Sequence, residues 1–512
     1  MKFKLLCFVG FLLMRVSAPA QNNYVREMYQ KLSLTFGEAR NPPELIIVQG
    51  KSDLIAGYFT SPSPTIKLDQ EIIDICRSFG KDSTNALAVI LSHELAHFYR
   101  RHDWCGEFAF AVRGTALSQN LKNASTTNRS AFESQADVDG LFNACLSGYR
   151  PFGAYPKLLA KIYDVYKRPD KIPNYPTKKE RIESAKAAEQ QATEGYAVFL
   201  TANTWLQLSN YEVATQHFDW LLKKFPSREI FNNAGVAQLL QALSLKARHE
   251  VPFIYPVELD SRSRLFTPNT RSGLEDNDRK IEVLLKTAQR NFEEALRKDP
   301  DYTPACVNLA CVFDLLGNYE AAIGKINELK SQRSLSSNAL TIRAIAYLHN
   351  EQMEKANRDF AEAQRLSGFG TTHNFALAQK GLAFVQNASE VVEWLEKNTP
   401  TQSFVSTKPP LGTFKAISAT PTIKLALNPT TTLSGILTTG ELSLESKSNA
   451  KVLKISKILS IEALTVGSSK ANVKEVLGLP IKENPTYWLY DGLIVNFDGD
   501  AGSELLQYQL KE

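Results

Sequence analysis

The stretch from Asp82 to His102 contains the motif that most constrains this chain, H-E-x-x-H at His93 to His97. Asp82 and Ser83 offer N-cap chemistry and neither Gly nor Pro interrupts residues 82–102, so the motif is predicted to lie inside a helix. On a helix the two histidines lie one turn apart on one face, where both can bind one Zn²⁺ while Glu94 reaches the metal's water. Three such side chains on a buried helix require a polar partner, and a metal would provide it.

A catalytic zinc site usually has three protein ligands, so a third ligand has to be found. His102 follows His93 by nine residues, whereas the extended motif places its third histidine ten residues on, after a glycine. His102 is therefore predicted to be a surface residue near the helix end, and a carboxylate is expected as the ligand. Glu133 lies on a predicted helix with Asp137 one turn later, which could accept the free ring N–H of a ligand histidine. A solvated acidic face is the alternative for this pair. Weaker ligand candidates lie at the end of the motif helix, at Asp103 and Glu107.

Residues 21–190 read as one compact α-rich domain around this motif. The apolar pattern predicts helices over Tyr24 to Leu34 and Asp69 to Phe79. Three short strands are expected, at Leu45 to Val48, Gly57 to Thr60 and Thr65 to Leu68.

Three segments together resemble the M48 family of zinc metallopeptidases: His93-Glu-Leu-Ala-His97, Glu133-Ser-Gln-Ala-Asp137 and Gly148-Tyr-Arg-Pro151. The resemblance is to its exported bacterial members that carry tetratricopeptide repeats, and it covers roughly residues 24 to 190. It implies a zincin-type fold with one zinc ion, held by His93, His97 and Glu133. It also implies that Glu94 is the general base and that Asp137 orients a ligand.

A last element of the family, H-P-x-x-x-x-R, is matched here by Tyr175-Pro-Thr-Lys-Lys-Glu-Arg181, so tyrosine stands where the family has histidine. In the family that histidine is thought to donate a hydrogen bond to the oxyanion, and a tyrosine hydroxyl can do the same. The resemblance implies that Arg181 fixes this loop or pairs with an acidic group near the site.

The first 20 residues are typical of a secretory signal peptide. Lys2 and Lys4 precede the apolar run Leu5 to Met14, and cleavage is expected after Ala20. That run is too short to span a bilayer, and no later stretch reaches the required length of about 20 apolar residues. The mature chain, with 56 basic and 54 acidic residues, is nearly neutral, which argues against nucleic acid as a partner. Five cysteines remain, so at least one thiol is expected to be free: Cys76, Cys105, Cys145, Cys306 and Cys311.

Residues 195–398 are predicted to form a tetratricopeptide repeat solenoid. The segment Asp314-Leu-Leu-Gly-Asn-Tyr-Glu-Ala-Ala322 carries the L-G-x-Y-x-x-A pattern of this helix–turn–helix repeat, and residues 335–366 repeat it. An insertion at about 250–280 shows no helical period. It is interpreted either as part of a binding face or as a disordered loop, and both interpretations stay open.

The remaining chain is predicted to consist of a linker at 399–450, rich in Thr, Ser and Pro, and a small α+β domain at 451–512. The fold class is therefore mainly α: a zincin-type domain, a repeat solenoid and a small C-terminal domain. The function expected is a zinc metalloendopeptidase that acts on misfolded or unassembled exported proteins in the periplasm or outside the cell. The alternatives are a catalytically idle scaffold or chaperone, and an adaptor that binds an envelope protein through its repeats.

Overall fold

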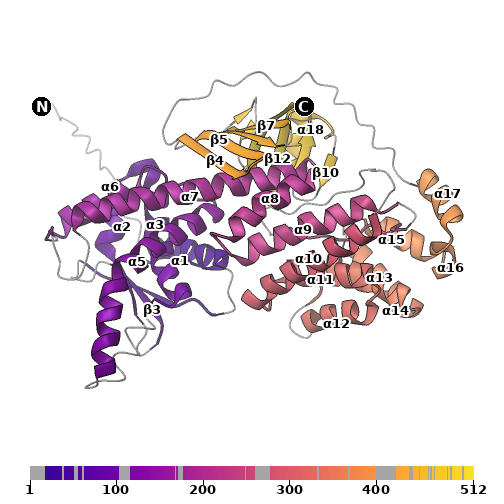
Figure 1. The fold of residues 1–512 in the computed structure, drawn as a ribbon, viewed down its shortest axis with the longest axis horizontal. Coiled ribbons are helices and arrows are strands. Elements are labelled where there is room, and N and C mark those ends of the chain that lie inside the picture. Colours follow the sequence, from indigo (N-terminus) through magenta and orange to yellow (C-terminus); the bar gives the residue numbers. More distant parts are fainter. Residues whose placement is uncertain are drawn as a thin grey trace, which may run out of the picture. The chain divides into compact units, whose positions relative to one another are not determined.

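The protein is described by a computed structural model in which the chain divides into two compact units, residues 1–35 with 42–183 and residues 36–41 with 184–512 (Figure 1). Within the part of the chain that is described, no helix is both long enough and apolar enough to cross a bilayer. The structure describes residues 18–36, 40–50, 56–59, 63–102, 116–167, 169–170, 177–247, 250–259, 277–330, 334–366, 370–398, 422–437, 442–448, and 450–511 except 459, 462–463, 466, 481, 485–486 and 499–500.

The first unit contains a three-stranded sheet with β3 (Thr65–Asp69) in the middle. β1 (Glu44–Val48) pairs with β3 in parallel and β2 (Ala56–Phe59) pairs with it antiparallel. Ile66 and Leu68 of the central strand are fully buried, as expected of a strand that is covered by helices. The three strands predicted from the sequence are confirmed.

Helices surround this sheet, and α3 (Ser83–Arg100) lies at their centre. Its residues from Ala86 to Ala96 are all buried, which identifies α3 as a core helix and not an amphipathic surface helix. α3 ends at Arg101, whose left-handed backbone (φ 56°) closes the last turn. The other helices of this unit are α1 (Ala18–Thr35), α2 (Gln70–Arg77), α5 (Ala116–Leu146), α6 (Tyr155–Val165) and the first turns of α7 (Lys178–Gln207).

The second unit begins with the rest of α7 and continues as antiparallel helix pairs, each packed against the next (Figure 1). Turns between paired helices are short, and Gly317 takes the positive φ (78°) that the turn between α11 and α12 requires. The helix–turn–helix unit predicted at residues 335–366 is confirmed. The helices are α8 (Tyr211–Leu222), α9 (Arg228–Leu245), α10 (Asn277–Lys298), α11 (Thr303–Leu315), α12 (Tyr319–Lys330), α13 (Ser337–His349), α14 (Met353–Arg365), α15 (Thr371–Ala378), α16 (Leu382–Val385) and α17 (Ala388–Asn398).

An eight-stranded antiparallel sheet follows, in the order β10-β11-β12-β13-β7-β6-β5-β4, with the helix α18 (Lys470–Leu477). The three strands that come first along the chain, β4, β5 and β6, lie in the region predicted to be a linker. That prediction is therefore wrong for residues 422–448. Buried Ile423, Leu433 and Leu444 alternate there with exposed Thr, Ser and Lys, which is a strand pattern despite the linker-like composition. The strands are β4 (Thr422–Asn428), β5 (Thr431–Leu437), β6 (Leu442–Ser448), β7 (Lys451–Ile458), β10 (Lys482–Asn484), β11 (Tyr487–Tyr490), β12 (Leu493–Asp498) and β13 (Ala501–Lys511).

The described cysteines are buried and none of them forms a disulfide: Cys76, Cys145, Cys306 and Cys311. At least one free thiol was expected from the odd number of cysteines, and buried thiols of this kind act as small apolar core residues. Cys105 lies outside the described residues, as does the predicted signal peptide up to residue 17.

Candidate metal centre

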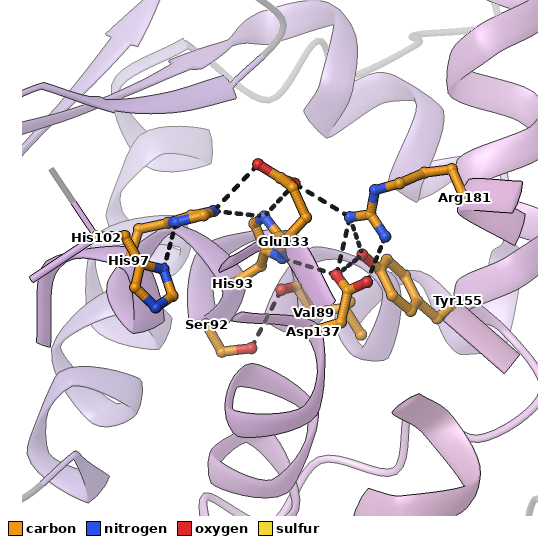
Figure 2. Close-up of polar contacts among 9 residues, drawn as sticks. All are labelled: Val89, Ser92, His93, His97, His102, Glu133, Asp137, Tyr155 and Arg181. Atoms are coloured by element: carbon orange, nitrogen blue, oxygen red, sulfur yellow. Dashed lines mark hydrogen bonds and ion pairs between the residues drawn. The ribbon is translucent and has the colours of Figure 1, made fainter. Parts of the chain in front are cut away.

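The two histidines of the motif face each other on one side of α3. Nε2 of His93 and Nε2 of His97 are 3.0 Å apart, as expected for residues separated by one helical turn (Figure 2). Glu133 of α5 completes a triangle with them. Its Oε2 lies 3.5 Å from Nε2 of His93, and its Oε1 lies 3.6 Å from Nε2 of His97.

The geometry of these three donors fits a tetrahedral metal ion. Ligand atoms at about 2.0–2.1 Å from a tetrahedral zinc are separated from one another by about 3.3–3.5 Å, close to the distances found here. One ligand atom from each of the three residues can be chosen so that all lie within 4.8 Å of one another. Two imidazoles and a carboxylate are also a donor set used by catalytic zinc sites. His93, His97 and Glu133 are therefore the residues that could hold the ion.

Asp137 controls the orientation of His93. Its Oδ1 forms an ion pair with Nδ1 of His93, at 2.9 Å. Asp137 is fully buried, so its charge acts on the imidazole with little screening from water. A proton held on Nδ1 leaves the lone pair of Nε2 directed at the metal position.

His102 controls the orientation of His97 in the same way. Its Nδ1 lies 2.8 Å from Nδ1 of His97 (Figure 2). Its Nε2 lies 3.1 Å from Oε1 of Gln135. The ring is stacked on Phe132, with centroids 4.6 Å apart. Because the Gln135 oxygen can only accept, Nε2 of His102 donates to it and Nδ1 of His102 accepts from Nδ1–H of His97. The lone pair of His97 Nε2 then also points to the metal position.

The prediction that His102 is merely a surface residue is therefore wrong. The αL residue Arg101 turns the chain at the end of α3, and this turn brings His102 back against His97. Helical spacing alone could not indicate this, because the contact depends on how the helix ends.

A buried arginine joins the two carboxylates. Both terminal nitrogens of Arg181 donate to Asp137, and Nη2 also lies 3.3 Å from Oε2 of Glu133 (Figure 2). Tyr155 donates its hydroxyl proton to Oδ1 of Asp137. The Arg181 side chain is only 4% exposed, so a full positive charge lies in the protein interior beside the proposed ligand set. Pairing with an acidic group near the site was one of the two roles expected for Arg181.

The pKa values of these groups show strong coupling. Burial alone would lower the pKa of His93, but the adjacent Asp137 and Glu133 raise it to about 10. Burial and the neighbouring His93 lower the pKa of His97 to about 3. Burial opposes ionisation of Glu133, yet His93, His97 and Arg181 hold its pKa below its usual range. Without a metal, the two histidines therefore carry one positive charge between them, which His93 favours, and Glu133 stays ionised.

The structure brings together His93, His97, Glu133, Asp137 and Arg181 from three helices. Glu94 follows His93 on α3 and is buried. Tyr175 lies outside the described residues.

Tyr155 and His102 are site residues that sequence reasoning missed. One indirect signal for Tyr155 is present in the sequence, since this residue follows Pro151 of the matched Gly-Tyr-x-Pro turn by four residues and begins α6.

Comparison with known proteins adds little to this description. No protein-family model matches the chain and no curated protein matches it. Among solved structures, it is similar to a thermophilic tetratricopeptide repeat protein of Thermus thermophilus, at 15% identity over 44% of this chain and 97% of that one, with a TM-score of 0.29. A tetratricopeptide repeat protein of Parabacteroides merdae is 15% identical over 60% of this chain and 98% of that one, with a TM-score of 0.25. The human IFIT1 dimer with PPP-AAAA is 12% identical over 64% of this chain and 93% of that one, with a TM-score of 0.30. TM-scores of this size carry no argument about fold or function, so the repeat architecture rests on the helix pairs themselves.

Proposed function

We propose that the protein is a zinc-dependent endopeptidase that cleaves misfolded or unassembled exported proteins, with its helical repeats binding substrate or a partner. The observation that carries this proposal is the convergence of His93, His97 and Glu133 on one point. In addition, a separate side chain orients each histidine: the buried Asp137 for His93 and the half-buried His102 for His97. Such outer partners are a usual accompaniment of histidine ligands in metal sites.

Each residue of the site would have a separate role in amide hydrolysis. A zinc ion held there would supply Lewis acidity, which polarises the scissile carbonyl and lowers the pKa of water toward about 7. Glu94 would take the proton of the attacking water and pass it to the leaving amine. Arg181 touches Glu133 and Asp137 and so would act as a positioning residue. Tyr175 would donate a hydrogen bond from its hydroxyl to the oxyanion.

The substrate class follows from the rest of the chain. A signal peptide would place the protein in an exported compartment, where partly unfolded envelope proteins are its accessible substrates. Stacked helix pairs form extended surfaces that bind other polypeptides, so the repeats could hold a substrate for cleavage.

The decisive experiment compares Glu94→Gln with the wild-type protein in zinc content and in cleavage of an unfolded protein. Zinc occupancy is expected to stay near one ion per chain, while cleavage should fall by about 10²–10⁴-fold. Glu27→Gln, at an exposed position of α1, is the matched control and should change neither quantity. Undiminished cleavage by Glu94→Gln would show that the base is assigned wrongly.

A second candidate is an adaptor, or an idle scaffold, that binds proteins through the helical repeats alone. This candidate is favoured by residues 251–259, a segment without helix or strand structure. The segment forms hydrogen bonds with side chains of α9, α11, α13 and α15. Co-purification of a stable partner that persists after zinc removal, with no cleavage by the zinc-loaded protein, would support this candidate against the peptidase.

A further inference from the structure

The segment from Val251 to Leu259 lies against the helix array without being helix or strand. It belongs to the long connection between α9 and α10. Phe253, Tyr255, Val257 and Leu259 are at most 5% exposed. A polypeptide segment with no regular structure is therefore buried along one face of the repeats.

Asparagine side chains hold the main chain of this segment at two places. Asn374 of α15 accepts from the backbone N–H of Ile254 and donates to its carbonyl, both at 2.8 Å. Asn308 of α11 does the same to Glu258, accepting from its N–H at 2.7 Å and donating to its carbonyl. Asn232 of α9 donates to that carbonyl as well, at 3.0 Å. These contacts use only backbone atoms of the bound segment.

The three asparagines are fully buried. A buried carboxamide that lacks hydrogen-bond partners costs free energy, and here the backbone of residues 254 and 258 supplies partners to all three side chains. They lie on α9, α11 and α15, which are the first helices of their pairs. The same kind of contact is thus repeated along the array, as a binding surface for a polypeptide requires.

Side-chain contacts add selectivity to this main-chain binding. The hydroxyl of Tyr255 donates to Oδ2 of Asp314 at 2.5 Å, and Nδ1 of His349 lies 3.0 Å from the other oxygen of that carboxylate. The ring of Phe253 packs edge-on against His349, with centroids 5.6 Å apart. The side-chain contacts of this face are therefore made to an aromatic residue and to a tyrosine two positions later.

Two further contacts hold side chains of the segment, those of Ile254 and Glu258. Gly370 makes room for Ile254, because a β-carbon there would lie 2.8 Å from Cγ2 of that residue. Asn338 of α13 donates to the Glu258 carboxylate at 2.7 Å, which favours an acidic residue three positions after the tyrosine.

We propose that the face lined by Asn232, Asn308, Asn338 and Asn374 is a binding site for a polypeptide segment of another protein, with an aromatic residue, a tyrosine two positions later and an acidic residue three beyond that. Residues 251–259 are its resident occupant and compete with that partner. A tether within the same chain gives the resident segment a high effective concentration, so an incoming segment binds only after displacing it. The site lies wholly within residues 184–512, and the proposal is independent of the metal centre.

The test uses the full chain with residues 251–259 replaced by Gly and Ser at equal length, and a fluorescein-labelled peptide of the sequence VPFIYPVEL. Fluorescence anisotropy is expected to show binding by the replaced protein and at least tenfold weaker binding by the wild type. Asn308→Ala with Asn374→Ala in the replaced protein should weaken binding at least tenfold. Asn398→Ala, at an exposed position of α17, should leave it unchanged, and a scrambled peptide should not bind.

Failure of the replaced protein to bind the peptide, when its circular dichroism and thermal unfolding match the wild type, would overturn the proposal. If the replacement prevents folding, the full chain with Phe253→Ala and Tyr255→Ala takes its place, since that variant removes only the anchoring side chains. Loss of folding in this variant too would show that the segment is a permanent part of the fold, and the proposal would again be wrong. Peptide binding by the folded double variant, sensitive to Asn308→Ala, supports it.

Discussion

Gly140 of α5 packs directly on the backbone of His93. A β-carbon at position 140 would lie 2.9 Å from the His93 nitrogen and 3.0 Å from its Cα. Real β-carbons do not approach backbone atoms so closely, and backbone cannot move aside as a flexible side chain can. The close approach of α5 to α3 at this point sets how near Glu133 and Asp137 of α5 come to the histidines.

Gly140→Ala is therefore expected to push α5 away from α3 and to disrupt the metal centre. Zinc affinity should fall at least tenfold, and the free energy of unfolding should fall by about 1–3 kcal/mol, as is typical of overpacked interiors. Zinc titration and denaturant unfolding measure the two effects. Gly324→Ala is the matched control, because Gly324 lies in α12 and a β-carbon added there would have no atom within 4 Å. That control should be neutral or slightly stabilising.

His102 should contribute to zinc affinity without binding the ion. His102→Ala removes the nitrogen that accepts the hydrogen bond from Nδ1–H of His97. The proton of His97 is then no longer held on Nδ1, away from the metal position. Loss of such an outer partner typically weakens metal binding by about 10–100-fold. His102→Asn retains a side-chain oxygen that can accept this hydrogen bond, and it should recover part of the affinity. Equal zinc affinity in wild type and His102→Ala would contradict the role assigned to His102.

Arg181 should stabilise the first unit as well as the site. Arg181→Met leaves Asp137 and Glu133 buried without their counter-cation, and breaking a buried ion pair in this way costs about 3–5 kcal/mol. Arg181→Lys keeps the charge but loses the two-point contact with Asp137, so it should recover only part of the stability. Denaturant unfolding of the zinc-free proteins measures both. Arg297→Met breaks an exposed pair with Glu294 and should have no measurable effect.

The sequence predicted the motif helix well, because the spacing of His93 and His97 fixes their relative position once the helix is assumed. Glu133 was harder, since its placement depends on how two helices pack, and only the combination of segments indicated it. The contact of His102 could not be predicted, because it depends on the left-handed residue that ends α3. The sequence indicated that residues 250–280 are an insertion without helical period, but it did not indicate what residues 251–259 contact. Their partners are asparagines spread over 142 positions, between Asn232 and Asn374, without a local pattern.

In the second unit, His217 links the first helical hairpin to the C-terminal sheet. Its Nδ1 lies 2.7 Å from the Val213 carbonyl oxygen, so this nitrogen donates. Its Nε2 lies 3.4 Å from Oγ of Ser446 on β6, and that oxygen also accepts from Nε1–H of Trp205 at 3.2 Å. With the Nδ1 proton in place, neutral His217 can accept at Nε2 from the Ser446 hydroxyl. A second proton on the ring would break this arrangement.

Burial lowers the pKa of His217 to about 4, although its bond to Val213 opposes the shift. The unfolded chain binds this proton below about pH 6.5 and the folded chain only below about pH 4, so stability is full above pH 6.5 and is lost as the pH falls. Between pH 7.5 and pH 5 the loss should be about 2 kcal/mol. Urea unfolding at both pH values, compared between wild type and His217→Gln, isolates this contribution. An equal pH dependence in the two proteins would show that His217 is not the group responsible.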